Sequence, residues 1–501
     1  MPRRSGHKPI NRRRAILSLG GVVLGAGIGQ FATRALAESG KGANQTYPVA
    51  PEMPAGVQPT SVMLTAKARL RQLKPAPLPP NDIYDYADGD GPIVMRLKQG
   101  DWLEAKLVNE IQEHTTIHWH GIRLPVAMDG VPYLTQPPVL PGESFTYRFQ
   151  PPDTGTFFFH PHCNTVEQLG HGLAGVLVVE GDETRPHDHD LVCAYRDWRI
   201  DEAGKFMPMM TTEGAAKAGT FGQHRTINDQ EHPVFKVPAG GDIRIRFLNL
   251  DMARVLDLGV TGTEAWVIAT DGNALPPIKL KSWRLGPAMR ADLTLRAPAT
   301  AGTRIQLVNY YAAQPIVMAE LEAVGPVLQR PDFVPAPLKP SAIPEPQLEG
   351  AETFPLRLGA SSVPADLPPD LVLPDGSVLR YADALCLTPN TFWAFNGQPW
   401  PSQSHEVLPP PLVTFQRGRT YVIELINQTP HIHPVHLHGH TFKVLSSSKG
   451  DIVPHFADTT IVAPKERVKI ALVADNPGDW MIHCHIIEHQ DTGMMGIFRV
   501  A

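Results

Sequence analysis

Short apolar runs separated by proline- and glycine-rich turns dominate the chain from residue 92 onward. The clearest of these runs are residues 173–179, 243–248, 420–426 and 467–473. Runs of this length, rich in Val, Ile, Leu and Phe and alternating with turns, predict antiparallel β-sandwiches. Few windows carry a long apolar stripe with helical periodicity, so we expect an all-β fold with only short, local helices.

A similar phrase in which a turn leads into an apolar strand occurs three times. The three phrases are residues 140–143 (LPGE), 237–241 (VPAGG) and 416–418 (QRG). Their recurrence predicts three copies of one sandwich, and the proline-rich stretch 326–346 is typical of an extended linker. The three predicted domains span residues 45–185, 186–335 and 336–501.

The composition is that of a folded chain with many turns. The 501 residues are 42% hydrophobic and 19% charged, with 51 Pro and 42 Gly, which suits short strands joined by turns. This composition excludes collagen, a coiled coil and a multi-span membrane protein. The four Cys are too few for a disulfide framework at this length.

Residues 1–37 have the pattern of an export signal. They contain seven basic residues and no acidic one, and the first six precede an apolar run over 15–29 and a small-residue site at 35–37. The run is too short to span a bilayer about 30 Å thick, so we expect no stable membrane span. Arg13-Arg14 followed by Ala-Ile-Leu resembles a twin-arginine signal, which predicts export to the periplasm or beyond by that machinery. Without this segment the formal charge is −5 − 7 = −12, which gives no basic stripe for nucleic acid.

Histidine pairs spaced two residues apart are more frequent than chance allows. Random placement of the 21 His would give roughly one His-x-His, whereas seven occur. The seven pairs are 118/120, 160/162, 187/189, 431/433, 436/438, 438/440 and 483/485. On a strand, residues i and i+2 point to one face about 6.6 Å apart, so two imidazoles reach one metal ion or two adjacent ions. Four such pairs from different strands would enclose a metal cluster.

Cys484 stands between His483 and His485, with His489 and Met494 five and ten residues further on. A thiolate, imidazoles and a thioether are the ligands of a blue copper site, whereas zinc rarely takes Met and iron–sulfur clusters need more thiolates. A lone Cys on a strand is usually a small buried hydrophobe, but these neighbours favour a ligand. Because side chains alternate along a strand, Cys484 points to one face and the two flanking His to the other. The tripeptide would therefore connect a mononuclear copper to a copper cluster.

These motifs together resemble those of the three-domain multicopper oxidases, which include laccases, bilirubin oxidases and bacterial copper-efflux oxidases. The motifs are HWHG at 118–121, HPH at 160–162, HPVHLHG at 433–439 and HCH at 483–485. The ending over 483–495 is most similar to the efflux-oxidase and spore-coat-laccase branch. The resemblance implies three cupredoxin-like Greek-key β-sandwiches, with a trinuclear copper site between the first and third and a second domain that is a spacer without copper.

The resemblance also implies four copper ions, and each motif supplies some of their ligands. The type 1 ligands are His433, Cys484, His489 and Met494, the type 2 ligands are His118 and His436, and the type 3 ligands are His120, His160, His162, His438, His483 and His485. The implied reaction removes four electrons, one at a time, from a small reducing substrate and reduces dioxygen to two waters. Four other paired histidines, His187, His189, His431 and His440, match no family motif and are expected not to bind copper.

Three further positions have roles that the resemblance implies. Asp129 falls where the family has an acid that assists proton delivery near the trinuclear site, the alternative being a turn Asp before Gly. Asp458 matches a position near the type 1 copper that engages substrate or Cu(I), the alternative being a strand-leading Asp. Gln490 stands where related bacterial enzymes often have a Glu that relays protons to dioxygen. Because an amide has no proton to exchange near neutral pH, Glu488, Asp491, a bound water or Asp129 alone must serve.

The motifs leave the substrate open. Efflux oxidases cover the type 1 site with a Met-rich insert in the third domain, because thioethers bind Cu(I), whereas residues 351–480 of this chain contain no Met. A cluster at 207–210 (MPMM) lies in the second domain and is expected to be loop or core rather than a soft-metal contact. We therefore expect a monomeric, laccase-like oxidase of phenols and aromatic amines, with cuprous oxidation for copper tolerance as the alternative.

A non-catalytic structural relative and a periplasmic copper store are the remaining alternatives. Both are disfavoured because all twelve expected ligands are present in the sequence. The other three cysteines, Cys163, Cys193 and Cys386, are expected to be reduced, buried thiols. The alternative for Cys163 and Cys193 is a disulfide, which requires their Cα atoms to lie within about 7 Å of each other.

Overall fold

The computed structural model describes residues 46–87, 89, 91–361, 370–372, 378–380, 392–401 and 408–501. One compact unit begins at Tyr47 and runs to the last residue of the chain. The predicted export signal and Cys386 lie outside the described residues. In the part of the chain that is described, no helix is both long and apolar enough to cross a membrane.

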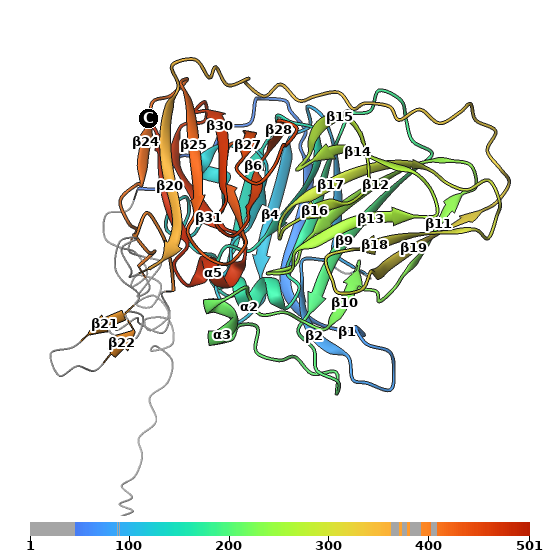
Figure 1. The fold of residues 1–501 in the computed structure, drawn as a ribbon, viewed down its shortest axis with the longest axis horizontal. Helices are drawn as coiled ribbons and strands as arrows, with labels where there is room; N and C mark the ends of the chain where they lie inside the picture. Colours follow the sequence, from blue (N-terminus) through green and yellow to red (C-terminus); the bar gives the residue numbers. More distant parts are fainter. Residues whose placement is uncertain are drawn as a thin grey trace, which may run out of the picture. The chain divides into compact units, whose positions relative to one another are not determined.

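β-Strands build almost all of the regular structure (Figure 1). The first group is β1 (Thr60–Arg71), β2 (Asn81–Asp85), β3 (Val94–Lys98), β4 (Leu103–Asn109), β5 (His118–His120), β6 (Ser144–Phe149), β7 (Gly155–His160) and β8 (Gly175–Glu180), in sheets β2-β1-β4-β6 and β3-β8-β7-β5. The second group is β9 (His189–Trp198), β10 (His224–Ile227), β11 (Val234–Pro238), β12 (Asp242–Asn249), β13 (Leu256–Thr261), β14 (Ala265–Thr270), β15 (Asn273–Lys279), β16 (Trp283–Leu285), β17 (Arg290–Arg296), β18 (Arg304–Asn309) and β19 (Ile316–Val324), in sheets β10-β9-β12-β17-β14-β15 and β11-β19-β18-β13-β16.

The third group of strands follows the proline-rich stretch. It is β20 (Glu352–Ala360), β23 (Trp393–Phe395), β24 (Val413–Phe415), β25 (Thr420–Asn427), β26 (His433–Leu437), β27 (Phe442–Ser447), β28 (His455–Ala457), β29 (Thr459–Val462), β30 (Arg467–Val473), β31 (Gly478–Cys484) and β32 (Met495–Val500), in sheets β23-β20-β25-β30-β27-β28 and β24-β32-β31-β26-β29. A separate hairpin pairs β21 (Asp370–Val372) with β22 (Val378–Arg380). The described helices are short, as predicted: η1 (Val126–Met128), α2 (Thr165–Gly170), α3 (Thr212–Ala216) and α5 (Ile487–Asp491).

The predicted all-β, cupredoxin-like sandwich fold is confirmed, with one correction to the strand pairing. Each group contains two parallel pairs among its antiparallel ones: β1–β4 and β3–β8, β9–β12 and β11–β19, β20–β25 and β24–β32. Parallel neighbours need a crossover connection, and β1 reaches β4 only after the chain has visited β3 in the other sheet. Strands β4 and β8 each have a parallel neighbour on one side and an antiparallel neighbour on the other, so the pattern along one strand does not distinguish the two kinds of pair.

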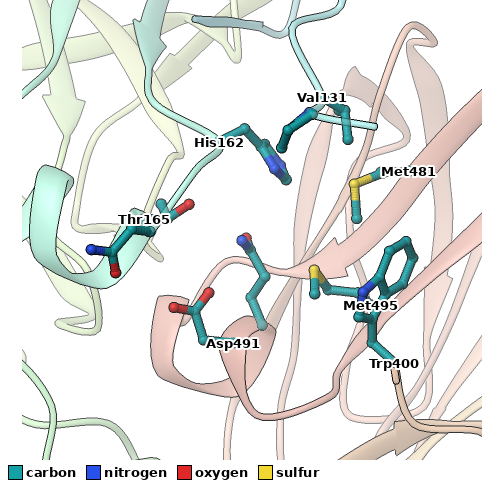
Figure 2. A pocket seen from close by; sticks show the side chains of 10 residues that line it. Val131, His162, Thr165, Trp400, Met481, Asp491 and Met495 are labelled. Carbon is teal, nitrogen blue, oxygen red and sulfur yellow. The ribbon is translucent and has the colours of Figure 1, made fainter. Parts of the chain in front are cut away.

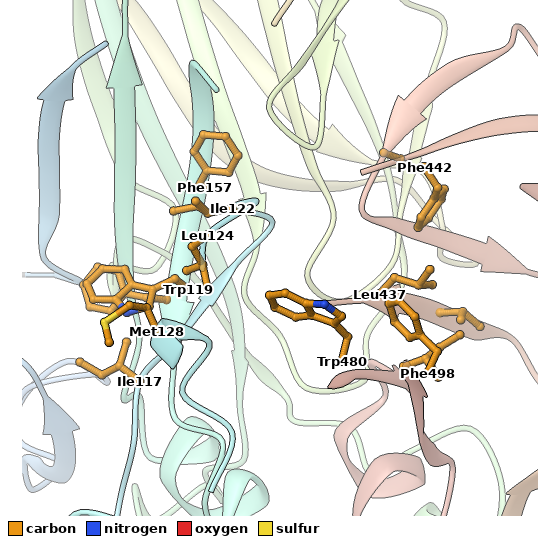
Figure 3. Close-up of a cluster of buried hydrophobic side chains, with 14 of the residues drawn as sticks. Ile117, Trp119, Ile122, Leu124, Met128, Phe157, Leu437, Phe442, Trp480 and Phe498 are labelled. Atoms are coloured by element: carbon orange, nitrogen blue, oxygen red, sulfur yellow. The ribbon is translucent and has the colours of Figure 1, made fainter. Parts of the chain in front are cut away.

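The first and third sandwiches share one buried apolar cluster (Figure 3), whereas the second has its own. Trp119 and Trp480 are both fully buried in the shared cluster. At the joint, the side-chain amide of Asn476 donates hydrogen bonds to the carbonyls of Leu124 and Gly439, at 2.8 and 3.0 Å. Segments more than 300 residues apart are thereby packed against each other. The predicted domain boundaries near 185 and 335 fall between β8 and β9 and between β19 and β20, and they stay predictions.

Candidate metal centre

Strand pairing brings the His-x-His motifs opposite one another. In the first sandwich β5 pairs with β7, so that His118 is directly opposite His160. In the third, β26 pairs with β31, so that His436 is opposite His483. Side chains opposite each other in an antiparallel pair start from Cβ atoms about 4.5–5.5 Å apart. Each of the two sandwiches therefore presents two histidine pairs on one face of a sheet.

Eight buried histidines from the two sandwiches meet in one cluster. This eight-histidine cluster consists of His118, His120, His160, His162, His436, His438, His483 and His485, of which none is more than 6% exposed. Rings from the two sandwiches stack against each other: the centroids of His118 and His438 are 3.8 Å apart, and those of His120 and His436 are 3.7 Å apart. The sequence-predicted type 2 and type 3 ligands are thus all brought together.

Two triplets within the cluster each combine histidines of both sandwiches. One triplet is His162, His438 and His483, and the other is His120, His160 and His485. The ligand atoms of the first triplet lie within 4.8 Å of one another, which suits a single ion. In the second triplet, the ring of His485 is 5.1 Å from that of His120 and 5.3 Å from that of His160. His483 thus lies with His162 and His438, whereas the ring of His485 lies nearest to those of His120 and His160, although one residue separates the two histidines.

The residue between them, Cys484, belongs to a second set of potential ligands. Its Sγ lies 3.6 Å from Nδ1 of His433 and 3.6 Å from Nδ1 of His489, and the two nitrogens are 3.1 Å apart. An ion at ordinary metal–nitrogen and metal–sulfur bond lengths of about 2.0–2.3 Å fits inside such a triangle. Met494 is fully buried, and its carbonyl accepts a hydrogen bond from the Cys484 N–H at 3.0 Å, which holds it beside the triangle.

Hydrogen bonds leave one nitrogen bare on several rings of the cluster. Nδ1 of His118 and Nδ1 of His160 each lie 2.9–3.0 Å from a backbone carbonyl, while Nε2 of each ring has no hydrogen-bond partner. In His120 the roles are exchanged, because Nε2 is hydrogen-bonded and Nδ1 has no partner. Neither ring nitrogen of His485 has a hydrogen-bond partner. Buried polar atoms without partners cost free energy. A metal ion would satisfy several imidazole nitrogens that point to one place. Copper binds both imidazole and thiolate ligands.

Burial keeps these imidazoles in the form that binds metal. It lowers the pKa well below the ordinary histidine value for His120, His160, His433, His438, His483 and His485. It also lowers the pKa of His489 to about 3, so the rings are neutral near pH 7. Burial raises the pKa of the Cys484 thiol, and a bound cation is what would make this sulfur a thiolate.

Asp129 bridges one histidine of each sandwich. Its Oδ2 accepts a hydrogen bond from Nδ1 of His438 at 2.9 Å, and its backbone carbonyl accepts one from Nδ1 of His118, also at 2.9 Å. Gly130, at φ +79°, allows this close approach, because a Cβ there would lie 1.8 Å from the carbonyl oxygen of Ile117. The Asp129 side chain is 1% exposed. Its place beside the cluster suits the predicted role in proton delivery, which stays a prediction.

Asp458 lies beside the eight-histidine cluster and directly before β29, which agrees with the alternative of a strand-leading Asp, and its predicted contact with substrate stays a prediction. Its Oδ1 is 3.0 Å from Nε2 of His120, and its backbone carbonyl accepts a hydrogen bond from Nδ1 of His436 at 2.8 Å. The side chain is 1% exposed and therefore does not lie at the protein surface. Burial alone would raise the pKa of this carboxyl, but Arg290 and His436 outweigh burial and hold the pKa below its usual range.

A small cavity reaches the eight-histidine cluster at His162 (Figure 2). Gln490 and Asp491 line it together with His162 and Trp400, and burial raises the pKa of Asp491 to about 7. The other acid considered from the sequence, Glu488, instead faces the second sandwich, where its carboxylate accepts hydrogen bonds from Thr220. Of the two acids near Gln490, Asp491 is therefore the one beside the cluster.

The second sandwich covers the Cys484 triangle with a segment that sequence reasoning did not assign to the site. The backbone carbonyl of Lys217, just after α3, accepts a hydrogen bond from Nε2 of His489 at 2.8 Å. Trp393 packs its ring 4.5 Å from that of His489 and 5.2 Å from that of His433, and its Nε1–H donates to the carbonyl of Ala215. These contacts depend on a backbone atom and on packing, so no motif could have indicated them.

The remaining predicted residues make contacts of other kinds. The ring nitrogens of His187 are both used, at 2.7 Å from Glu183 and 2.9 Å from Thr294. His440 is buried against Trp480 and Phe498, and His431 and His189 are partly exposed. Met209 packs in an apolar core cluster, in agreement with its interpretation as core. Cys163 and Cys193 are free, buried thiols and form no disulfide with each other.

Three sandwiches with a thiol–imidazole triangle one residue from an eight-histidine cluster define a class of copper-binding oxidases. Profiles described as "Multicopper oxidase" match residues 90–184, 190–317 and 381–501. The multicopper oxidase MmcO of Mycobacterium tuberculosis is 30% identical over 436 residues, which are 81% of this chain and 80% of the relative. The chain therefore belongs to the multicopper oxidase family and is an oxidase.

Two further relatives support the same family. The crystal structure of a multi-copper oxidase from Pseudomonas thermotolerans has a TM-score of 0.79 and 37% identity, covering 89% of this chain and all of that one. Laccase-1 of Botryotinia fuckeliana is 27% identical over 435 residues, which are 79% of this chain and 74% of the relative. Family membership implies that copper is the metal, dioxygen the oxidant and a reducing compound the substrate.

Proposed function

We propose that this protein couples the one-electron oxidation of phenols and aromatic amines to the reduction of dioxygen to two waters, with four electrons and four protons consumed per dioxygen. Bound copper would supply the one-electron steps and the dioxygen-binding site. The observation that supports this most is the His483-Cys484-His485 tripeptide. It connects the thiol–imidazole triangle to both histidine triplets through covalent backbone.

The proposed ligand sets follow the family resemblance, and the division of the type 3 ligands follows the two triplets. A type 1 copper would be held by His433, Cys484, His489 and Met494, a type 2 copper by His118 and His436, and a type 3 pair by His162, His438 and His483 on one ion and by His120, His160 and His485 on the other. Hydrogen bonds orient several of these rings before any ion binds, since Asp129, Asp458 and backbone carbonyls occupy one nitrogen of His438, His120, His160 and His483. Such partners orient a metal-binding imidazole and select its tautomer.

Phenols and aromatic amines are favoured over Cu(I) by the surroundings of the triangle. Residues 351–480 contain no Met, so this part of the third sandwich offers no thioether to Cu(I). A laccase is also among the relatives. Cuprous oxidation is the second candidate because Met210 is 38% exposed, seven residues before Lys217 in the covering segment.

Oxygen uptake by the copper-loaded protein distinguishes these candidates. The substrates compared are 2,6-dimethoxyphenol, an aromatic diamine, bilirubin and Cu(I), each at a concentration that supplies the same number of electrons. We expect the fastest uptake with the phenol or the diamine, and a higher rate with Cu(I) would select the cuprous oxidase instead. A copper-replete protein without visible thiolate-to-copper absorption would contradict the type 1 assignment, and absorption without uptake would identify a non-catalytic relative.

Replacing Gln490 by Glu is expected to raise the rate of dioxygen reduction. Gln490 lines the cavity that reaches His162, and its Oε1 has no hydrogen-bond partner. A carboxyl at this place adds an exchangeable proton, and the gain should stay below the roughly 100-fold of a full general acid. The measurement is oxygen uptake at saturating phenol with dioxygen varied. Anaerobic reduction of the type 1 copper serves as the control and should not change, and an equal or lower uptake rate in the variant contradicts the idea.

We also propose that the protein works as an exported monomer, carried by the twin-arginine machinery. The support is the order of basic, apolar and small residues over 1–37. Changing Arg13 and Arg14 to Lys should leave the protein in the cytoplasm, as measured by fractionation of expressing cells. Changing Arg3 and Arg4 to Lys is the matched control and should leave export unchanged. Equal export of both variants would refute the twin-arginine route.

A further inference from the structure

Arg290, on strand β17 of the second sandwich, reaches the eight-histidine cluster although its own sandwich contributes no histidine to it. The side chain is fully buried. Its guanidinium forms a two-pronged ion pair with Asp458 of the third sandwich, Nη1 to Oδ1 at 2.9 Å and Nη2 to Oδ2 at 2.6 Å. Its Nε donates to the carbonyl of Thr156 in the first sandwich at 3.2 Å. One side chain therefore contacts all three sandwiches.

Asp458, the residue that Arg290 holds, is in direct contact with two histidines of the cluster, one through its carboxylate and one through its backbone carbonyl. Oδ1 of Asp458 accepts the hydrogen of His120 Nε2, which turns the bare Nδ1 of that ring toward the cluster. The backbone carbonyl of Asp458 does the same for His436 through Nδ1. The orientation of one predicted type 2 ligand and one predicted type 3 ligand thus depends on the place of a single residue.

Two further residues show that this contact is built closely into the fold. Gly121, immediately after His120, lies at φ +85°, and a Cβ there would be 2.4 Å from Oδ2 of Asp458 and 2.6 Å from Nη2 of Arg290. The fourth residue of the HWHG motif therefore leaves room for the ion pair. On the other side, the carboxylate of Asp271 accepts hydrogen bonds from the backbone N–H groups of Arg290 and Thr459, at 2.9 and 3.2 Å. Asp271 ties β17 to the chain next to Asp458.

We infer that Arg290 is a positioning residue for the trinuclear copper site, so that the second sandwich takes part in building that site and is not only a spacer. A guanidinium presents two parallel donors that fix both oxygens of a carboxylate. The two-pronged ion pair holds Asp458 in one position. The hydrogen bonds of Asp458 then hold the rings of His120 and His436 in place. The inference rests on the proposed copper assignment and adds to it a residue from outside every ligand motif.

The test compares Arg290→Lys with a matched variant, Arg244→Lys. Arg244 lies on the neighbouring strand β12, is fully buried, and forms a similar two-pronged pair with Asp182 at 2.9 and 2.6 Å. A lysine keeps the charge but not the fork. For Arg290→Lys we expect type 2 and type 3 copper to be lost to a competing chelator about tenfold more readily, the low end of the effect of such partners.

Spectroscopy separates positioning from a general loss of structure. In Arg290→Lys the electron paramagnetic resonance splitting of the type 2 copper should change while the visible type 1 absorption stays, and Arg244→Lys should match the wild type in both. Identical copper retention and type 2 splitting in Arg290→Lys and Arg244→Lys would overturn the inference. A wild-type protein that takes up copper but lacks the type 1 absorption would instead indicate failure of the proposed function.

A second pair of variants decides the matter if Arg290→Lys does not fold. Gly121→Ala inserts a methyl group between Asp458 and Arg290, and Gly142→Ala adds one at a similar φ of +81° where nothing lies within 4 Å. Backbone strain is then common to both variants, and only the first disturbs the ion pair. Selective loss of type 2 and type 3 copper in Gly121→Ala supports the inference, and equal behaviour of the two alanine variants refutes it.

Discussion

Replacing Cys484 by Ser is expected to abolish the visible thiolate-to-copper absorption and to reduce oxygen uptake more than about 100-fold, the upper range for loss of a mere outer partner of a ligand. The sulfur lies 3.6 Å from each of the two nitrogens with which it forms the triangle. A serine hydroxyl is a much poorer ligand than a thiolate for the copper of such a site. Without a functional type 1 copper, electrons from the substrate have no bonded route to the cluster.

The spectra and copper content of the Cys484→Ser variant should show a selective loss. Its near-ultraviolet and paramagnetic signals from the eight-histidine cluster should persist, because His483, in β31, and His485, directly after this strand, keep their backbone positions. Cys193→Ser is the matched control, since this thiol is also fully buried but lies in the core of the second sandwich. The control should keep both the absorption and the uptake. Retained blue colour in Cys484→Ser would refute the central assignment.

Replacing Asp129 by Ala is expected to lower the turnover of dioxygen about 100-fold with the type 1 absorption unchanged. The carboxylate is the acceptor for Nδ1 of His438, whereas the backbone carbonyl that holds His118 survives the change. One type 3 ligand loses its orienting partner, and an acid in contact with the cluster is removed. Oxygen uptake at saturating phenol measures the fall, and anaerobic reduction by the same phenol should proceed at the wild-type rate.

Asp129→Asn divides this effect into its two parts. An amide oxygen can still accept the hydrogen of His438, but the amide cannot supply a proton near neutral pH. If proton delivery dominates, Asn and Ala lower turnover alike, and if orientation dominates, Asn stays near the wild type. Asp153→Ala is the control, because Asp153 is a buried acid of the same sandwich paired with Arg123 rather than with a histidine. A wild-type rate in Asp129→Ala would contradict both roles.

Local patterns predicted the strands and the donor sets because they depend on spacing alone. The two-residue alternation of a strand places His118 and His120 on one face, and it separates Cys484 from His483 and His485, whatever the rest of the chain does. The structure brings the eight histidines together and places Cys484 with His433 and His489. Parallel pairing was missed because alternation is the same in parallel and antiparallel neighbours.

The contacts of single acidic residues outside the histidine motifs were predicted less well. Asp458 has no spacing relation to the histidines that it contacts, and its place follows from the pairing of β26 with β29, in which His436 lies opposite Thr459. The same holds for Asp491 and Glu488, which are three residues apart in or at the end of α5 but face the cavity and the second sandwich respectively. Helical spacing alone does not say which neighbour each side of a short helix meets.

The sequence by itself determined that this chain is a β-protein of three similar parts with a thiol and paired imidazoles at metal-binding spacing. These features depend on period and composition, which are properties of neighbours along the chain. Only the tertiary structure decided that Arg290 reaches Asp458 and that the carbonyl of Lys217 covers His489. Such contacts join residues 168 and 272 positions apart, and they are set by how the sandwiches pack, which no local pattern encodes.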